Sequence, residues 1–213
     1  MDELTSPLII GFVGSFFLLA ILSLTAFIKV SVTLMIVRNA LGLQQVPANT
    51  VVMVLSLFIS IFVSMPVFTE ATATISEANI EGATPNELFA LARTAIEPFQ
   101  EFLLRHTSPE HLSFFVTVSN RVWEGSGLVG TGDDFIIQVP SFMITQLTEA
   151  FEIGFLLYLP FVAIDLAVTG ILMALGMQMV QPNIISVPFK LLTFVFVDGW
   201  SKLVEGLVLT YAA

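Results

Sequence analysis

The sequence predicts an all-α membrane protein, in which about four hydrophobic segments surround one acidic helical insert. Hydrophobic residues make up 56% of the chain, charged residues only 11%, and the mean hydropathy is +0.93, whereas an ordinary soluble domain is roughly 25% charged. The charges are also uneven, because most of the 17 acids lie in residues 70–152. We therefore divide the chain into an N-terminal hydrophobic hairpin (1–69), an acidic helical region (70–139) and a C-terminal hydrophobic hairpin (140–213).

Composition also excludes several classes of site and partner. The 213 residues include no cysteine, so disulfides and thiolate metal sites are ruled out. A net charge of −10 argues against nucleic acid, which needs a basic surface. Asp2 and Glu3 stand where a signal peptide would carry bases, so we interpret the first apolar run as a retained span.

The first hydrophobic segment runs from Leu4 to Ile28 without a charge and is long enough to cross about 30 Å of bilayer as a helix. Lys29 and Arg38 follow it. By the positive-inside rule, these two bases predict that the 29–49 loop is cytoplasmic and that the acidic region faces outward.

The second hydrophobic segment, Thr50 to Phe68, follows a turn through Gly42 and Pro47. Three of its serines recur every four residues and share one helical face: Ser56, Ser60 and Ser64. Small residues at this spacing let helices approach closely in lipid. We favour this packing role over the alternative, incidental serines on a core helix.

The acidic region contains two predicted helices. Thr84 is a candidate cap for a helix from Pro85 to Arg105, and Ser108–Pro109 opens another. His106 and His111 are five residues apart, a poor spacing for two metal ligands on one helical face, so we treat them as surface residues.

A glycine-rich loop follows at residues 124–134. Gly125, Gly127 and Gly130 spell G-x-G-x-x-G, but a dinucleotide site needs a preceding strand and a following helix. More glycines and acids follow here instead, so a flexible loop is favoured.

The last two hydrophobic segments are a helix over 140–164 that continues apolar to Leu175, and a helix from Val187 to Thr210. A break at 176–182 separates them, and Asp165 and Lys190 lie within the apolar sequence on either side. Such charges usually mark function. Because a hairpin turning at the break brings the two to similar depth, we favour a structural ion pair over charges on a conducting path. Asp165 and Asp198 suit an aspartyl enzyme only in principle, and we predict no catalytic residue.

Three methionines flank the break: Met173, Met177 and Met179. Methionine is flexible and polarisable and suits surfaces that must adapt in shape. From these residues alone, filling of an apolar core is the favoured interpretation.

Three blocks of the sequence closely resemble the type III secretion export-gate family, called SctR in injectisomes and FliP in flagella. The blocks are FIKVSVTLMIVRNALGLQQVP (27–47), ITQLTEAFEIGFLLYLPFVAIDLAV (144–168) and LMALGMQMVQPNIISVPFKLLTFVFVDGW (172–200). The resemblance covers nearly the whole chain. The short length, the retained N-terminus and the GMQMV sequence resemble the injectisome branch more than the flagellar one.

The resemblance implies a pore-forming subunit of a protein export channel associated with virulence, without enzymatic activity, metal or cofactor. Kinked helical hairpins from five copies would form a homo-oligomer and assemble with SctS-like and SctT-like subunits into a helical funnel, next to an SctU-like switch protein. The funnel would lie in the bacterial inner membrane at the base of the secretion needle, where unfolded exported proteins pass through it.

The resemblance also places a pore gasket at Met177, Gln178 and Met179, which reverses the core-filling interpretation for these two methionines and leaves Met173 as packing. The alternative function is an ion-coupled small-solute transporter using Asp165 and Lys190. It is weakened by the acidic insert and by the lack of repeated halves.

Overall fold

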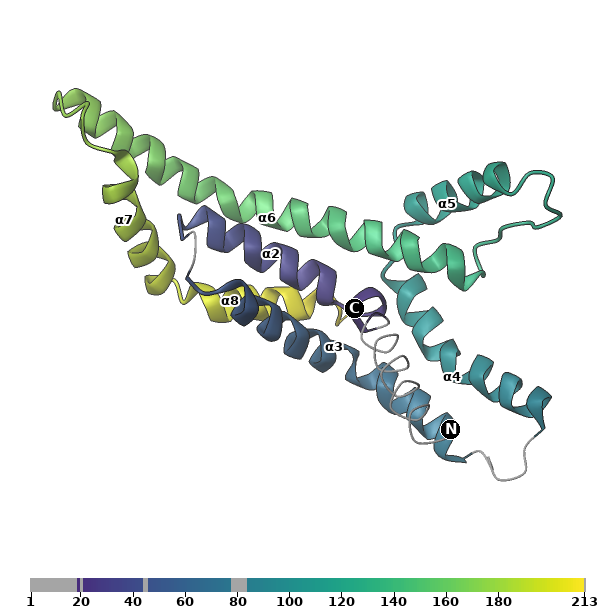
Figure 1. Ribbon diagram of the computed structural model, residues 1–213. Coiled ribbons are helices and arrows are strands. Elements are labelled where there is room, and N and C mark those ends of the chain that lie inside the picture. Colours follow the sequence, from purple (N-terminus) through teal and green to yellow (C-terminus); the bar gives the residue numbers. More distant parts are fainter. Residues whose placement is uncertain (1–18, 20, 44–45, 78–83, 213) are drawn as a thin grey trace, which may run out of the picture. The chain divides into compact units, whose positions relative to one another are not determined.

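The computed structural model describes residues 19, 21–43, 46–77 and 84–212, and the regular elements among them are helices (Figure 1). The helices are α2 (Phe27–Ala40), α3 (Asn49–Glu77), α4 (Pro85–Arg105), α5 (Pro109–Val122), α6 (Phe135–Ala174), α7 (Pro182–Phe196) and α8 (Gly199–Leu209). These described ranges contain no strand, and the predicted all-α class is confirmed.

Two of these helices are long and apolar enough to cross a membrane, at Asn49–Thr74 and Phe135–Ala174, and the α7–α8 pair adds a third if it counts as one bent span. They correspond to three of the four predicted hydrophobic segments. The first, 4–28, lies almost wholly outside the described residues. At 40 residues, α6 is about 60 Å long, twice the hydrocarbon core of about 30 Å, so an upright α6 reaches well beyond the bilayer.

By its contacts the chain forms two compact units. The first contains 1–28 and 60–146, and the second contains 29–59 and 147–213. Each unit is therefore built from two separate stretches of chain, whereas the three predicted segments follow composition along the sequence. The division into three segments concerns which parts of the chain meet membrane and which meet solvent, and it stays a prediction.

In the first unit, the predicted cap of α4 is present. The Thr84 side chain accepts a hydrogen bond from the Glu87 amide, and the Glu87 carboxylate accepts one from the Thr84 amide. These reciprocal bonds satisfy two backbone donors at a helix start. The core lies between α4 and the first turns of α6, where Leu103 and Phe142 are fully buried and the Phe142 ring is 5.9 Å from that of Phe102.

The two histidines of this unit are bonded rather than free on the surface, which corrects the prediction. His111 Nδ1 lies 2.8 Å from the hydroxyl of Thr145 on α6. The His106 carbonyl accepts a hydrogen bond of 2.9 Å from Gln146, and its ring lies 4.7 Å from that of Phe102. Both side chains are half-buried, and the His111 side chain and the His106 carbonyl hold the α4–α5 turn against α6.

The glycine-rich loop is confirmed as a loop between two helices. Gly125 and Gly127 have positive φ values of 85° and 77°, a conformation that glycine adopts without steric cost. Asn120 of α5 fixes the far end of the loop through two hydrogen bonds with the backbone of Gly130. A helix precedes this loop, so the strand that a dinucleotide site requires is absent at this position.

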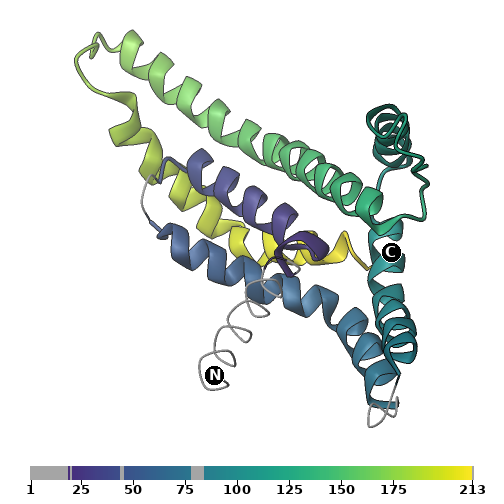
Figure 2. The same cartoon turned by 45° about the vertical axis from the view of Figure 1, so that its right-hand side comes forward.

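The second unit is organised around α2, which occupies most of the predicted 29–49 loop. Val30 and Leu34 are fully or almost fully buried, and α2 runs beside α6 in both Figure 1 and Figure 2. The contact is close, because a Cβ added to Gly154 of α6 would lie 2.5 Å from Ile36. Beyond the end of α2, a Cβ added to Gly42 would lie 2.6 Å from Val187 of α7.

The last predicted helix, Val187 to Thr210, is wrong as a single element. It is two helices, α7 and α8, bent by 62°. Asp198 adopts a left-handed backbone with φ of 52°, which ends regular helix. Gly199 then lies against the ring of Phe194, where an added Cβ would overlap the ring carbons, so the bend brings the start of α8 directly onto α7.

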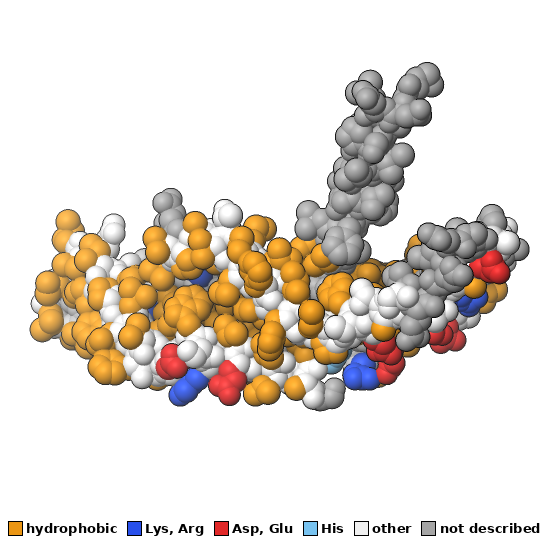
Figure 3. All heavy atoms as spheres, turned by 90° about the horizontal axis from the view of Figure 1, so that it is seen from below, with side chains coloured by type: hydrophobic (Ala, Val, Ile, Leu, Met, Phe, Trp, Pro, Cys, Tyr) orange, Lys and Arg blue, Asp and Glu red, His pale blue; other side chains and the backbone are white. Residues whose placement is uncertain are grey.

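Much apolar side-chain surface stays exposed in a single chain. Figure 3 shows hydrophobic side chains over most of the face that it draws. Phe62 is 70% exposed, Val195 72% and Phe196 80%. Soluble monomers rarely expose contiguous apolar patches of this kind, so lipid or other subunits must cover this surface.

Candidate gate loop and buried ion pairs

The tip loop, residues 175–181, joins α6 to α7 with a defined backbone. Gly176 has φ of 72°, and the amides of Gly176 and Met177 donate to the carbonyls of Met173 and Leu172 at 3.0 and 2.9 Å. This pair of bonds is a Schellman motif, which stops a helix at a left-handed glycine. A turn from Met177 to Val180 follows, closed by a 3.2 Å hydrogen bond. The predicted break is thus confirmed.

The predicted gasket residues lie on this tip loop and point outward from the chain. Met179 is 98% exposed, Met177 45%, and Gln178 is also exposed. Met173, predicted to pack in the core, is 60% exposed, so that prediction is wrong within a single chain. The turn has too few residues to bury its own side chains. Its flexible apolar groups are therefore exposed for contact with other molecules.

The structure brings Asp165 and Lys190 together. Lys190 Nζ lies 2.5 Å from Asp165 Oδ2 and donates a 3.0 Å hydrogen bond to the carbonyl of Ala40, the last residue of α2. A helix C-terminus carries partial negative charge, which favours a cation there. Lys190 is almost fully buried, while the Asp165 side chain is 34% exposed. The ammonium therefore ties three helices of the second unit together.

A second ion pair, Lys29 with Glu149, was not predicted from the sequence. Lys29 Nζ lies 2.5 Å from Glu149 Oε2, donates to Thr210 at 3.3 Å and lies 4.2 Å from the centroid of the Tyr211 ring. The sequence alone places Lys29 at the edge of a loop predicted to be cytoplasmic and assigns Glu149 no role. The available signal was two opposite charges, one directly after the first apolar segment and one within the third.

Arg38, the other base behind the predicted orientation, is also buried, with 7% exposure. Its Nη1 donates to the Pro47 carbonyl at 3.2 Å and to Asn49 Oδ1 at 2.5 Å. It therefore holds the connection between α2 and α3. Because both bases serve packing, the orientation stays a prediction.

The three serines of α3 all lie on its buried face: Ser56 and Ser60 are 0% exposed and Ser64 1%. Ser60 Oγ lies 2.8 Å from the hydroxyl of Thr25, whereas Ser56 donates to the carbonyl of Val52 in its own helix. The burial is what close helix packing requires, and that role stays a prediction.

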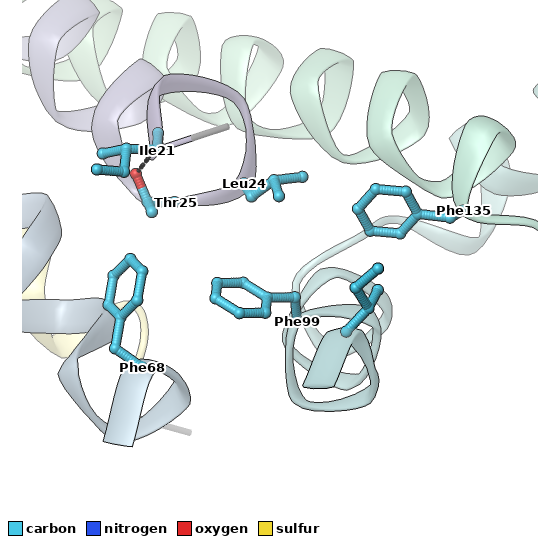
Figure 4. Close-up of a pocket in the computed structure, with 7 residues that line it drawn as sticks. Ile21, Leu24, Thr25, Phe68, Phe99 and Phe135 are labelled. Carbon is cyan, nitrogen blue, oxygen red and sulfur yellow. Dashed lines mark hydrogen bonds between the residues drawn. The ribbon is translucent and has the colours of Figure 1, made fainter. Parts of the chain in front are cut away.

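The first unit also contains an apolar cavity of about 320 Å³, shown in Figure 4. Three phenylalanines from three helices point into it: Phe68, Phe99 and Phe135. Its polar lining residue, Thr25, donates its hydroxyl to the Ile21 carbonyl. A ligand would thus meet no free polar group among the residues that line this cavity.

The acids that could serve an aspartyl enzyme or a metal are engaged separately. Asp165 binds Lys190, and Asp198 accepts a hydrogen bond from Ser201 at the α7–α8 bend. Within the described residues, no group of three or more His, Asp or Glu side chains is placed to hold a metal ion.

Comparisons with known proteins agree with the export-gate resemblance. The FliP family matches residues 11–207. A probable translocation protein, y4yL, of Sinorhizobium fredii is 48% identical over 194 residues, which cover 91% of this chain and 87% of the relative. The hypersensitivity response secretion protein HrcR of Ralstonia nicotianae is 43% identical, with 90% of each chain covered. The Yop proteins translocation protein R of Yersinia pestis is 37% identical over 213 residues, covering 99% and 97%. This chain therefore belongs to the FliP family, the type III secretion export-gate family whose sequence blocks it resembles.

Proposed function

We propose that this chain is the core pore-forming subunit of an injectisome export gate, through which unfolded proteins cross the bacterial inner membrane. The observation that carries the proposal is the exposed Met177–Gln178–Met179 turn at the end of an apolar hairpin. Family membership supplies the class of machine, and the relatives are named for secretion and translocation. The chain acts as a conduit and not as an enzyme.

The turn explains how one site can be closed to ions and still adapt to a passing polypeptide. Copies arranged around an axis bring their tip loops together, and the thioether side chains form an apolar constriction that excludes ions by dewetting. Because methionine has three flexible torsions and a polarisable sulfur, the constriction reshapes around the side chains of a passing polypeptide. The Schellman bonds of α6 hold the backbone in place meanwhile.

The proposed assembly contains five copies of this chain with SctS-like and SctT-like subunits, beside an SctU-like switch protein, at the base of the secretion needle. Its support is the exposed apolar surface together with an α6 that is longer than a bilayer is thick. The transporter alternative has no comparable support. Lys190 is closed onto Asp165 and a helix end, and the relatives are named for protein secretion.

The gasket is tested by the double variant Met177→Ala/Met179→Ala in the purified assembly. We expect normal assembly but an open resting conductance to small ions, because two short side chains no longer close the constriction. Met173→Ala, one turn earlier on α6, is the matched control and should stay tight. An unchanged resting conductance in the double variant would remove the tip loop from the gate.

Co-purification tests the assembly separately. A tagged copy should retain two smaller hydrophobic proteins of different sequence in mild detergent. Recovery of this chain alone, as a complete homo-oligomer, would contradict the export-gate assignment.

A further inference from the structure

An apolar groove lies beside the bend between α7 and α8, within the second unit. Its volume is about 370 Å³, and pockets for small molecules span roughly 300–1,000 Å³. Buried side chains from four helices form its floor: Val37 of α2, Phe161 of α6, Phe194 of α7 and Leu203 of α8. Thr193, which also lines the groove, is exposed, so a ligand from outside the chain can enter.

Lys202 of α8 is the charged residue among those that line the groove. Its side chain is exposed, and it forms no salt bridge with any residue that the structure describes. The groove borders the α7–α8 pair, which is apolar enough to cross a membrane as one bent span. An unpaired charge at such a place is costly, so this ammonium favours an anionic group that arrives with a ligand.

Two carboxylates flank Lys202 along α8. Glu205 follows it by three residues, which places both on one side of the helix, and Asp198 stands at the helix start. Both acids are exposed, and neither forms a salt bridge within the part of the chain that the structure describes. The end of the groove therefore carries a positive charge between two negative ones. This order disfavours a purely anionic ligand and suits a zwitterion that carries its cation close to its anion.

We propose that this groove binds a phospholipid with an ethanolamine headgroup. The phosphate pairs with Lys202, the headgroup ammonium lies near Asp198 or Glu205, and an acyl chain fills the apolar groove. A soluble anion would leave the apolar floor uncovered, and an anionic lipid would meet the two carboxylates without a cation of its own. The site is separate from the tip loop. It adds to the proposed function a lipid that supports the bend between α7 and α8.

Native mass spectrometry of the full chain, purified in mild detergent, tests the headgroup. Three lipids with the same acyl chains are added in turn: phosphatidylethanolamine, phosphatidylglycerol and diacylglycerol. We expect the chain to retain phosphatidylethanolamine several-fold more than either of the others. Lys202→Gln should lower that retention several-fold, whereas the matched control Arg121→Gln, which removes an exposed cation of α5, should leave it unchanged. Asp198→Asn/Glu205→Gln should bring phosphatidylethanolamine and phosphatidylglycerol to equal retention.

Thr193→Trp tests the groove itself. The Thr193 hydroxyl donates to the Phe189 carbonyl of its own helix, so the larger side chain should narrow the groove while all charges stay in place, and retention of phosphatidylethanolamine should fall several-fold.

Two results would overturn the proposal. One is retention of phosphatidylglycerol or diacylglycerol at or above that of phosphatidylethanolamine, including no retention of any of the three. The other is retention of phosphatidylethanolamine that neither Lys202→Gln nor Thr193→Trp lowers, because the lipid would then bind elsewhere on the apolar surface. The resting conductance of Met177→Ala/Met179→Ala depends on a different part of the chain, so the proposed gate can stand while this lipid site fails.

Discussion

At the scale of single residues, the second unit is held by buried cations at the two ends of α2. Lys29 lies near its first turn and Lys190 at its last carbonyl, each with a carboxylate of α6 as its partner. Removing one member of a buried pair leaves an uncompensated charge, which costs about 3–5 kcal/mol. The partial exposure of Glu149 and Asp165 reduces this cost, since water solvates a carboxylate that has lost its lysine.

This asymmetry predicts the effects of substitutions in the first pair. Asp165→Ala leaves Lys190 buried and unpaired and should impair assembly and export more than Lys190→Ala, which leaves a partly hydrated carboxylate. The double variant should be less harmful than the sum of both. Recovery of the assembled complex, measured for the three variants, gives the coupling between Asp165 and Lys190. Strictly additive losses in the double variant would show that the two side chains do not interact favourably.

At the scale of elements, glycines decide where the long helices stop. Gly42 ends α2 and Gly176 ends α6, both with positive φ and the same pair of backbone bonds. A side chain in this conformation costs roughly 1–2 kcal/mol. The surroundings of Gly176 are open, so a side chain at this position would cost only backbone conformational energy. A side chain at Gly42 would also collide with Val187 of α7.

Gly176→Ala should therefore destabilise the purified chain by about 1–2 kcal/mol and loosen the tip loop. Gly206→Ala is the matched control, because Gly206 lies within α8 in open space and alanine is favoured there by roughly 0.5–1 kcal/mol. Unfolding in detergent should move in opposite directions for the two variants. Equal changes in unfolding stability for the two variants would mean that residue 176 does not need its left-handed backbone conformation to end α6.

The start of α4 gives a pH-dependent prediction. Hydrogen bonds from the Thr84 backbone and side chain hold the pKa of Glu87 below its ordinary value of 4.5. A lowered folded-state pKa stabilises the helix start above that ordinary value, and the contribution is lost as pH falls through the folded pKa. Amide-exchange protection in the first turn should fall on acidification in the native chain. It should stay level in Glu87→Gln, which cannot titrate, and parallel losses in both would exclude Glu87 as the cause.

At the scale of the whole molecule, a single chain leaves much apolar side-chain surface exposed. Among the residues that the structure describes, two or three helical elements are apolar enough to cross a membrane, yet large side chains such as Phe58 and Phe62 stay exposed. Lipid or other subunits must cover this surface, and any partner that binds the folded chain would also stabilise it.

Orientation is tested by labelling single cysteines with a membrane-impermeant reagent before assembly. Glu124, in the glycine-rich loop, and Val46, between α2 and α3, are both exposed. We expect Glu124→Cys to react in cells with a permeabilised outer membrane, and Val46→Cys to react only after the inner membrane is opened. The reverse pattern would invert the topology.

The sequence by itself determined the class, the helices of the acidic region, the break after α6 and the family. The class, the helices and the break depend on composition or on residues a few positions apart, as with Thr84 and Glu87 or Gly176 and Pro182, whereas the family is indicated by three long sequence blocks. Even the Asp165–Lys190 pair was predictable, because one hairpin brings its two members to similar depth.

Only the tertiary structure decided which distant groups meet. Lys29 and Glu149 lie on helices far apart in the sequence, so no local pattern could join them. The sequence suggested that Arg38 belongs to a cytoplasmic loop, whereas in the structure its side chain donates hydrogen bonds to Pro47 and Asn49. The bend at Asp198 was not predicted either, although the groups that meet there, Gly199 and the ring of Phe194, are only five residues apart. Local rules fix where a helix starts and stops, whereas packing between remote segments fixes which side chains it buries.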